Sequence, residues 1–188
     1  MNAIFLDKDG TLIDDIPYNV APHRMTLCDG AGPALRLLSA RGYRLFVVSN
    51  QDGIGNGRFT EATMVVVGAR LSQLLATEHL VLAGFYYCPH HPRAALARYA
   101  CTCNCRKPAP GMLLRAARQH GIDLAASWMI GDILHDVEAG NRAGCRSVLL
   151  DKGHETEWLA GPQRTPTHTA RDLPHAAQLI AAHDGDCR

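Results

Sequence analysis

The chain has no apolar run approaching the roughly 20 residues that a membrane-spanning helix needs. It also lacks a basic N-terminal segment followed by a long apolar stretch, so no secretory signal peptide is expected. The formal net charge is only +1, which favours neither nucleic acid nor an anionic membrane surface as a partner. No exposed apolar stripe is evident. We therefore expect a cytoplasmic monomer without nucleic-acid or membrane partners.

Internal repeats, low-complexity tracts and linkers are also absent. Hydrophobic residues make up 47% of the 188 residues and charged residues 20%, which is typical of globular proteins. This length is sufficient for one domain with a substantial core. We therefore expect residues 1–188 to form a single domain.

Strand and helix patterns alternate along the whole chain. Short apolar runs predict strands at 3–7, 44–49, 81–87, 128–130 and 147–150. Helical patterns fall at 31–41, 60–78, 111–120, 134–143 and 173–183, while 88–110 and 152–167 are expected to be loops. This alternation predicts an α/β fold with a doubly wound, Rossmann-like parallel sheet and helices on both faces.

Two aspartates follow the first predicted strand. The apolar run 3–6 ends at Asp7 and Asp9, and Gly10-Thr11 comes next. In open α/β sheets, ligands bind outside the carboxyl ends of the strands. Like-charged carboxylates crowd together only if a cation or a proton offsets them, and Mg²⁺ suits such hard oxygen ligands. The segment therefore predicts a magnesium site.

Three more polar clusters stand beside predicted elements that share this sheet edge. They are Ser49-Asn50-Gln51, Arg106-Lys107-Pro108, and Gly131-Asp132 with Asp136 further on. Together with the aspartates they supply a nucleophile, metal ligands and donors for phosphoryl oxygens. A phosphoryl-transfer site needs these parts.

The four clusters, in this order, resemble the four motifs of the haloacid dehalogenase phosphatase superfamily. The resemblance implies that Asp7 attacks phosphorus and forms an aspartyl-phosphate. It implies that Asp9 protonates the leaving oxygen and then activates water. Mg²⁺ would be held by Asp7, the backbone carbonyl of Asp9 and Asp132.

The same resemblance gives roles to three further side chains. Ser49 and Lys107 would bind phosphoryl oxygens, and Asp136 would orient the surroundings of the metal. Positive charge from Mg²⁺ and Lys107 should keep Asp7 ionised. Because Asp9 must gain and lose a proton, its side chain should lie off the metal.

Cysteine and histidine gather in one loop. Seven cysteines, without an export signal, argue against a disulfide framework. Thiolates and imidazole together favour tetrahedral Zn²⁺. Cys-x-His pairs with Cys-x-Cys, but spacing leaves the choice open among six candidates: Cys88, His90, His91, Cys101, Cys103 and Cys105. We expect the other cysteines to be structural or incidental: Cys28, Cys145 and Cys187.

Residues 86–92, 103–108 and 111–113 closely resemble the D-glycero-D-manno-heptose-1,7-bisphosphate 7-phosphatase family. This resemblance implies a phosphatase that removes the 7-phosphate in nucleotide-activated heptose synthesis, with a zinc loop at about 88–105 and no separate cap domain. It also implies that Arg106 recognises the distal phosphate of the bisphosphate substrate. The zinc ligands would be Cys88, His90, Cys103 and Cys105, leaving Cys101 and His91 outside the site.

The sequence departs from the family pattern at three positions, one of which is the additional Cys101. Ile133 stands where a basic residue is usual, and Asp52 replaces a small neutral residue. The expected substrate-binding residues are Asp15, Tyr18, Ser49, Asn50, Gln51, Asp52, Arg106 and Lys107. We expect the other histidines to be surface or packing residues: His23, His79, His120, His135, His154, His168, His175 and His183.

Other functions fit parts of the pattern. Histidinol-phosphate phosphatases are close relatives with the same motifs and a similar zinc loop, and another small sugar phosphate is a further possible substrate. A zinc-loop binding module with an inactive core is disfavoured by the near-neutral charge and the intact acidic set. A phospho-acceptor signalling domain would explain the acidic pocket, but not the zinc loop or Asp9.

Overall fold

The computed structural model describes residues 1–186, so Cys187 lies outside the described part of the chain. A six-stranded sheet has the order β3-β2-β1-β4-β5-β6, and all neighbouring strands are parallel. The strands are β1 (Ala3–Leu6), β2 (Arg44–Asn50), β3 (Leu82–Cys88), β4 (Trp128–Gly131), β5 (Arg146–Leu150) and β6 (His168–Ala170). The predicted doubly wound parallel sheet is confirmed.

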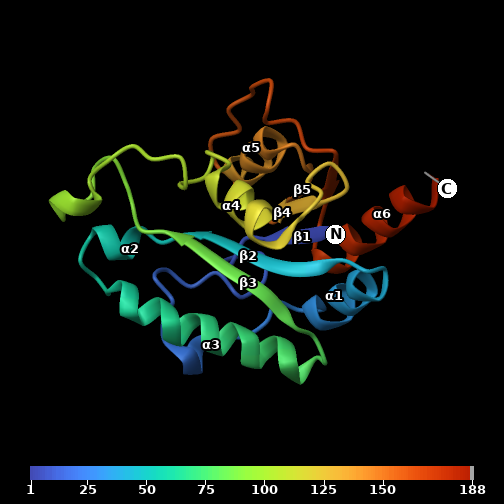
Figure 1. Cartoon of the computed structure of the whole chain (residues 1–188), viewed down its shortest axis with the longest axis horizontal. Coiled ribbons are helices and arrows are strands. Elements are labelled where there is room, and N and C mark those ends of the chain that lie inside the picture. The colour runs from blue at the N-terminus through green and yellow to red at the C-terminus, as the bar shows by residue number, and fades with distance from the viewer. Residues whose placement is uncertain (187–188) are drawn as a thin grey trace.

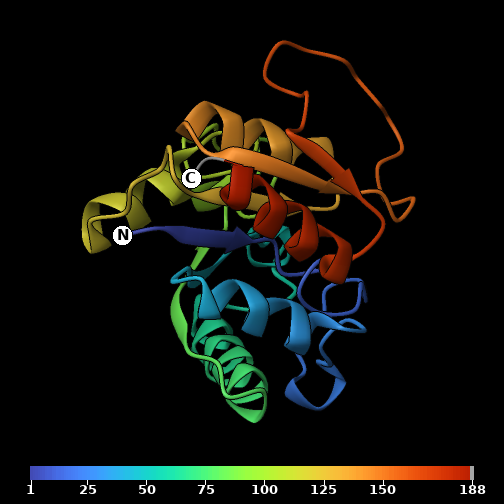
Figure 2. The ribbon, with the colours of Figure 1, turned by 90° about the vertical axis from the view of Figure 1, so that its right-hand side faces the viewer.

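Helices cover both faces of this sheet (Figures 1 and 2). The α-helices are α1 (Ala31–Ala40), α2 (Asp52–Gly55), α3 (Glu61–Thr77), α4 (Gly111–His120), α5 (Leu134–Ala143) and α6 (Leu173–Asp186). Helices α1, α3 and α6 pack on one face, and α4 and α5 on the other. None of the helices within residues 1–186 combines the length and the apolar character needed to cross a bilayer.

The alternation of side chains along β1 explains the two-sided core. Ile4 and Leu6 pack into the core beneath α1, α3 and α6, whereas Ala3 and Phe5 pack beneath α4 and α5. Successive side chains of a strand point to opposite faces, and both faces here are covered. All four residues of β1 are therefore fully buried, as expected of a central parallel strand.

The strand order reverses between β1 and β4. The chain passes from β1 to β2 and β3 on one side, then crosses to β4, β5 and β6 on the other. Ligands bind at such a switch point, outside the carboxyl ends of the strands. The architecture therefore directs attention to the loops after β1 and β4.

One short α-helix and one short strand were not predicted from the sequence, nor were the single-turn 3-10 helices Pro22–Arg24 and Ala97–Tyr99. Helix α2 follows β2 directly, and β6 adds a strand at the sheet edge beside β5. Each has at most four residues, too few to show a helical or alternating period. The predicted loop at 152–167 connects β5 to β6.

Candidate active site

A cleft of about 470 Å³ opens at the carboxyl ends of β1 and β2. It brings together every substrate-binding residue expected from the sequence, along with Asp7 and Asp9. The lining residues are Asp7, Asp9, Asp15, Pro17, Tyr18, Ser49, Asn50, Gln51, Asp52, Gly53, Arg106, Lys107, Ile133 and His135. Segments nearly 130 residues apart in sequence therefore meet in one concave site.

Lys107 is at the centre of the polar contacts. Its buried Nζ lies 2.6 Å from Asp7 Oδ1 and 2.5 Å from Asp136 Oδ1. It also donates a hydrogen bond of 3.1 Å to the carbonyl of Val48, at the end of β2. Burial opposes the charged form, but the Asp136 and Asp7 carboxylates outweigh it and raise the pKa of Lys107. The ammonium is therefore charged and fixed beside Asp7.

Asn50 positions the backbone of Lys107. Its Nδ2 donates to the Lys107 carbonyl at 3.0 Å, and its Oδ1 accepts from the Lys107 amide at 3.0 Å. The neighbouring Ser49 hydroxyl accepts a 2.8 Å hydrogen bond from Gln51 Nε2. Strand β2 thus supplies both a cleft hydroxyl and a two-point support for the lysine.

Asp9 differs from Asp7 in its surroundings. Its Oδ1 lies 2.5 Å from Nζ of Lys8, and the buried Lys8 ammonium also donates to the Asn19 carbonyl at 3.2 Å. Burial raises the pKa of Asp9 to about 6, with Lys8 opposing this shift and the Asp7 charge adding to it. A carboxyl with that pKa holds or releases a proton near neutral pH, as a general acid and base must.

Three carboxylates form a compact acidic group. Oxygens of Asp7, Asp132 and Asp136 all lie within 4.8 Å of one another. Burial, with neighbouring carboxylates adding, raises the pKa of Asp132 above its ordinary value and that of Asp136 to about 7. Lys107 alone does not balance this much negative charge, so the donor set fits a divalent cation with hard oxygen ligands, such as Mg²⁺.

Local backbone geometry allows this crowding. A Cβ at Gly131, the last residue of β4, would overlap the side chain of Asp136. Asp136 also accepts a 3.4 Å hydrogen bond from the Ile133 amide, which caps the start of α5. One carboxylate therefore contacts Lys107 and fixes a helix end, which orients the segment carrying Asp132.

The expectation that His154 is a surface or packing residue is wrong. His154 Nδ1 contacts Asp132 Oδ2 directly, and His135 lines the cleft. Gly10 permits this approach: its φ is +73°, and a Cβ there would overlap Asp132 and His154. His154 follows β5, so its place after a strand at this sheet edge was a signal available in the sequence.

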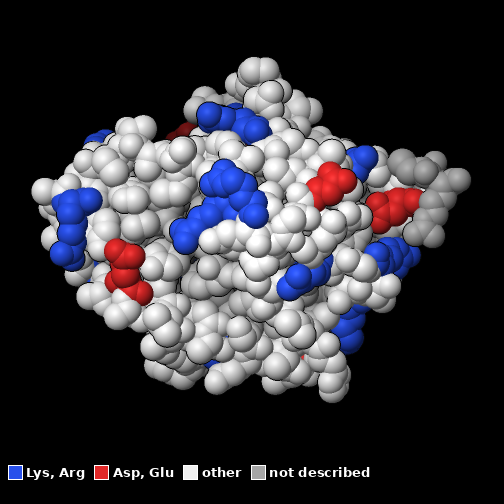
Figure 3. Space-filling model, viewed as in Figure 1, with Lys and Arg blue, Asp and Glu red and all other residues white. Residues whose placement is uncertain are grey.

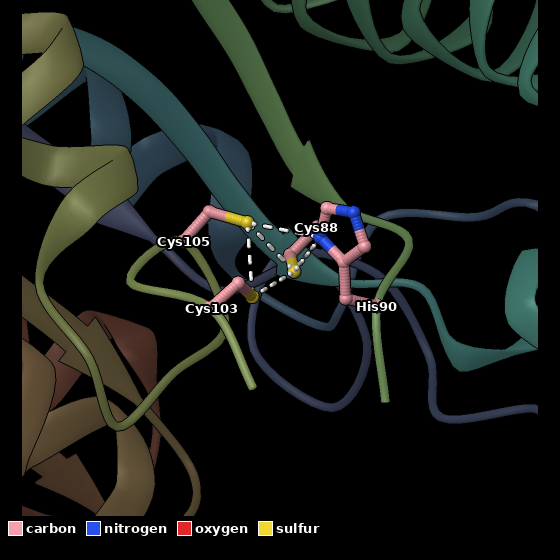
Figure 4. A group of neighbouring side chains, drawn as sticks. All are labelled: Cys88, His90, Cys103 and Cys105. Carbon is pink, nitrogen blue, oxygen red and sulfur yellow. Dashed lines mark hydrogen bonds between the residues drawn. The ribbon is translucent and has the colours of Figure 1, made fainter. Parts of the chain in front are cut away.

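A second cluster lies beside the cleft (Figure 4). Cys88 ends β3, and its Sγ lies 3.0 Å from Cys105 Sγ and 3.5 Å from Cys103 Sγ. His90 Nδ1 lies 3.6 Å from Cys88 Sγ and 3.4 Å from Cys105 Sγ. Ligands on a tetrahedral Zn²⁺ would stand about 3.5–3.8 Å apart, given Zn–S bonds of about 2.3 Å. The four side chains fit zinc.

The structure separates these four residues from the other candidates in the loop. Cys101 is exposed and outside the cluster, and His91 Nδ1 instead accepts a 3.0 Å hydrogen bond from the Arg93 amide. The Cys105 thiol has its pKa lowered to about 5, chiefly through its hydrogen bond with Cys88. A thiolate is the form that binds metal.

Arg106 links this cluster to the cleft. It follows Cys105 in sequence, and its guanidinium donates to the carbonyl of His90 at 3.2 Å. The same guanidinium forms a two-point ion pair with Asp52, at the start of α2. The Cys/His loop therefore holds both the backbone and the head group of Arg106.

Several known proteins are similar to this chain in both sequence and fold. A family model described as HAD-hydrolase-like matches residues 104–176. The D-glycero-beta-D-manno-heptose-1,7-bisphosphate 7-phosphatases of Salmonella typhi and Escherichia coli K12 are 43% identical over 148 residues, which is 79% of this chain and 79% and 78% of theirs. The chain belongs to this family. It is therefore a phosphatase, as its motifs predicted.

Solved structures of this phosphatase type superpose over nearly the whole chain. A HAD-like phosphatase from Mesorhizobium loti is 31% identical with a TM-score of 0.84, covering 98% of this chain and 87% of that one. A D,D-heptose 1,7-bisphosphate phosphatase from B. bronchiseptica, solved with magnesium and phosphate, is 28% identical with a TM-score of 0.77, covering 97% and 99%. The predicted superfamily fold is thereby confirmed.

Proposed function

We propose that this phosphatase removes the 7-phosphate of D-glycero-D-manno-heptose 1,7-bisphosphate through an aspartyl-phosphate on Asp7. The central observation is the contact of 2.6 Å between the Asp7 carboxylate and the buried ammonium of Lys107, inside a cleft of about 470 Å³. A carboxylate placed beside a fixed cation is suited to attack an electrophilic phosphorus. Two family members 43% identical to this chain carry that substrate in their names.

The cleft provides groups for each step. Asp7 forms a bond to phosphorus as the bond to the sugar oxygen breaks, and a protonated Asp9 supplies the proton to that oxygen. Asp9 then takes a proton from the water that attacks phosphorus, which frees Asp7 and inorganic phosphate. Lys107 and the Ser49 hydroxyl, both lining the cleft, would donate hydrogen bonds to the phosphoryl oxygens.

Two metals belong to this proposal. Asp7, Asp132 and the backbone carbonyl of Asp9 would hold Mg²⁺, which would offset negative charge on the phosphoryl group. Cys88, His90, Cys103 and Cys105 would hold a structural Zn²⁺. The acidic group and the Cys/His cluster support these assignments, and the B. bronchiseptica relative was solved with magnesium and phosphate.

A phosphate-release assay on two substrates tests the substrate assignment. Heptose 1,7-bisphosphate should give a higher kcat/KM than histidinol phosphate, and ³¹P NMR should show that the 1-phosphate remains on the product. Equal or faster turnover of histidinol phosphate, or retention of the 7-phosphate, would overturn the assignment.

Histidinol phosphate is the second candidate because of one observation. Asp52 pairs with Arg106, so this end of the site carries a carboxylate as well as a guanidinium, and Asp15 lines the same cleft. A cationic substrate end would meet less repulsion there than in a purely basic pocket. The two-substrate assay separates the candidates.

We also propose where the enzyme acts. Its product would feed the synthesis of nucleotide-activated heptose for lipopolysaccharide and related surface glycoconjugates. The three cysteines of the Cys/His cluster, Cys88, Cys103 and Cys105, form no disulfide, which suits a reducing compartment such as the cytoplasm. Lys and Arg form several separate patches on the face in Figure 3, with Asp and Glu near some of them, and the formal net charge is only +1. This charge distribution favours a small-molecule substrate over a nucleic acid. We further propose that the enzyme acts as a monomer.

A further inference from the structure

The distal end of the cleft contains an ion pair that the catalytic steps do not use. Arg106 and Lys107 are the only Lys or Arg residues among the cleft-lining residues described. Lys107 is already committed to Asp7 and Asp136. Arg106 is therefore the cation left for a second phosphate on the substrate.

In the structure, Asp52 already forms an ion pair with this guanidinium. Two oxygens of Asp52 face the two terminal nitrogens of Arg106, the two-point geometry in which guanidinium binds a carboxylate or a phosphate. A substrate phosphate must therefore compete with Asp52 for Arg106, and it meets the Asp52 charge while doing so. Like-charge juxtaposition of this kind is a common means of rejecting a ligand.

The pair is accessible to substrate and yet held in place. The side chains of Arg106 and Asp52 are 23% and 34% exposed, so a ligand in the cleft reaches both. Arg106 keeps a 3.2 Å hydrogen bond to the His90 carbonyl that does not involve Asp52. Removing the Asp52 charge should therefore free the guanidinium for a ligand without releasing it from the cleft.

We propose that Asp52 is a specificity-determining residue that neutralises Arg106, so that the enzyme accepts sugar esters carrying one phosphate nearly as well as bisphosphates. This inference rests on the proposed function, because it takes the reacting phosphate to lie at Asp7 and the other end of the substrate to lie at Arg106. It assigns a substrate class that is wider than bisphosphates alone.

The test compares kcat/KM for heptose 1,7-bisphosphate and heptose 7-phosphate. We expect the two values to lie within about threefold in the wild type. Asp52→Asn should raise the bisphosphate-to-monophosphate ratio about 10-fold, mainly through a lower KM for the bisphosphate, which is about 1.4 kcal/mol. Asp52→Glu should keep the ratio near the wild-type value, because it retains the charge.

A double-mutant cycle shows whether Asp52 acts through Arg106. Arg106→Gln alone should change the bisphosphate-to-monophosphate ratio little. In the double variant, it should remove the increase in that ratio that Asp52→Asn causes. Asp15→Asn is the matched control, since Asp15 is a cleft carboxylate that does not contact Arg106. Its effect should be smaller and independent of Arg106.

Failure of this inference is distinguishable from failure of the proposed function. If heptose esters are poor substrates, the same ratio is read with fructose 1,6-bisphosphate and fructose 6-phosphate, counting only release of the 6-phosphate. An unchanged or lower ratio in Asp52→Asn, or a gain that survives Arg106→Gln, would overturn the role of Asp52. A gain in Asp15→Asn as large as that in Asp52→Asn would do the same.

Discussion

The carboxylate site and the Cys/His loop lie next to each other but are built differently. Asp7, Lys107 and Asp132 come from distant parts of the chain and meet because parallel strands end at one sheet edge. The Cys/His cluster comes from one short stretch, 88–105, most of which has no regular structure. The first depends on the fold for its geometry, whereas the second would use a bound metal ion to fix a loop. Loss of the chemistry at Asp7 should therefore leave the Cys/His loop intact, whereas loss of the loop should weaken the chemistry only in part.

The largest expected effect comes from Asp7→Asn. The amide keeps the size of the side chain but removes the nucleophilic charge beside Lys107. We expect kcat to fall by at least about 10³-fold in a phosphate-release assay. Bound zinc, measured by elemental analysis, should stay at the wild-type level. Retained activity would remove Asp7 from the mechanism, and lost zinc would show that the two regions are not separable.

A smaller effect is expected from breaking the Cys/His cluster. Cys105→Ser removes a ligand directly before Arg106. We expect zinc to be lost, kcat/KM to fall about 10- to 100-fold and Tm to fall by about 5 °C, because Arg106 and Lys107 lose their anchored loop. Differential scanning calorimetry checks the Tm. Normal zinc content with normal activity would contradict the assignment of this ligand.

His154→Gln should act on the metal site without removing a ligand. His154 contacts Asp132, and partners that orient a metal ligand typically contribute about 10-fold to metal affinity or activity. We expect the Mg²⁺ concentration for half-maximal activity to rise about 10-fold, with kcat at saturating Mg²⁺ within about threefold of wild type. His23→Gln, at an exposed position, is the matched control. An unchanged Mg²⁺ requirement in His154→Gln would argue against a positioning role.

The smallest effect is expected at the fifth cysteine near the cluster. Cys101 is exposed and lies outside the group of four, so Cys101→Ser should leave zinc content unchanged and kcat/KM within about twofold. This variant controls for Cys105→Ser, because both make the same chemical change within the same loop. Zinc loss in Cys101→Ser would mean that the cluster uses a different set of ligands.

The sequence predicted the scaffold better than the local contacts. The strand-helix alternation identified five of the six strands because each is a run of mainly apolar residues, buried in β1, β2, β4 and β5 and half-buried in the edge strand β3. The three-residue β6 and the four-residue α2 were not predicted, because they are too short to show a strand or helix periodicity. Likewise, spacing identified the Cys/His loop but left Cys101 equivalent to Cys105, and only the fold distinguishes them.

Contacts between distant segments were the hardest to foresee. His154 and Asp132 are 22 residues apart in the sequence. Their contact also requires that residue 10 be a glycine, because a Cβ there would overlap both side chains. Asp52 and Arg106 are 54 residues apart in the sequence, and their ion pair joins the start of α2 to the end of the Cys/His loop. The sequence showed that Asp52 departs from the family pattern, but it did not show that Arg106 is the partner of this carboxylate.

The covalent role of Asp7 is the central claim, and trapping the intermediate tests it most directly. The wild-type enzyme would be acid-quenched during turnover, treated with borohydride to reduce any aspartyl-phosphate, and digested for mass spectrometry of the peptides. We predict that Asp7 is converted to homoserine only when substrate is present, and that Asp7→Asn shows no conversion. Reduction at another carboxylate, or none during steady turnover, would contradict the account.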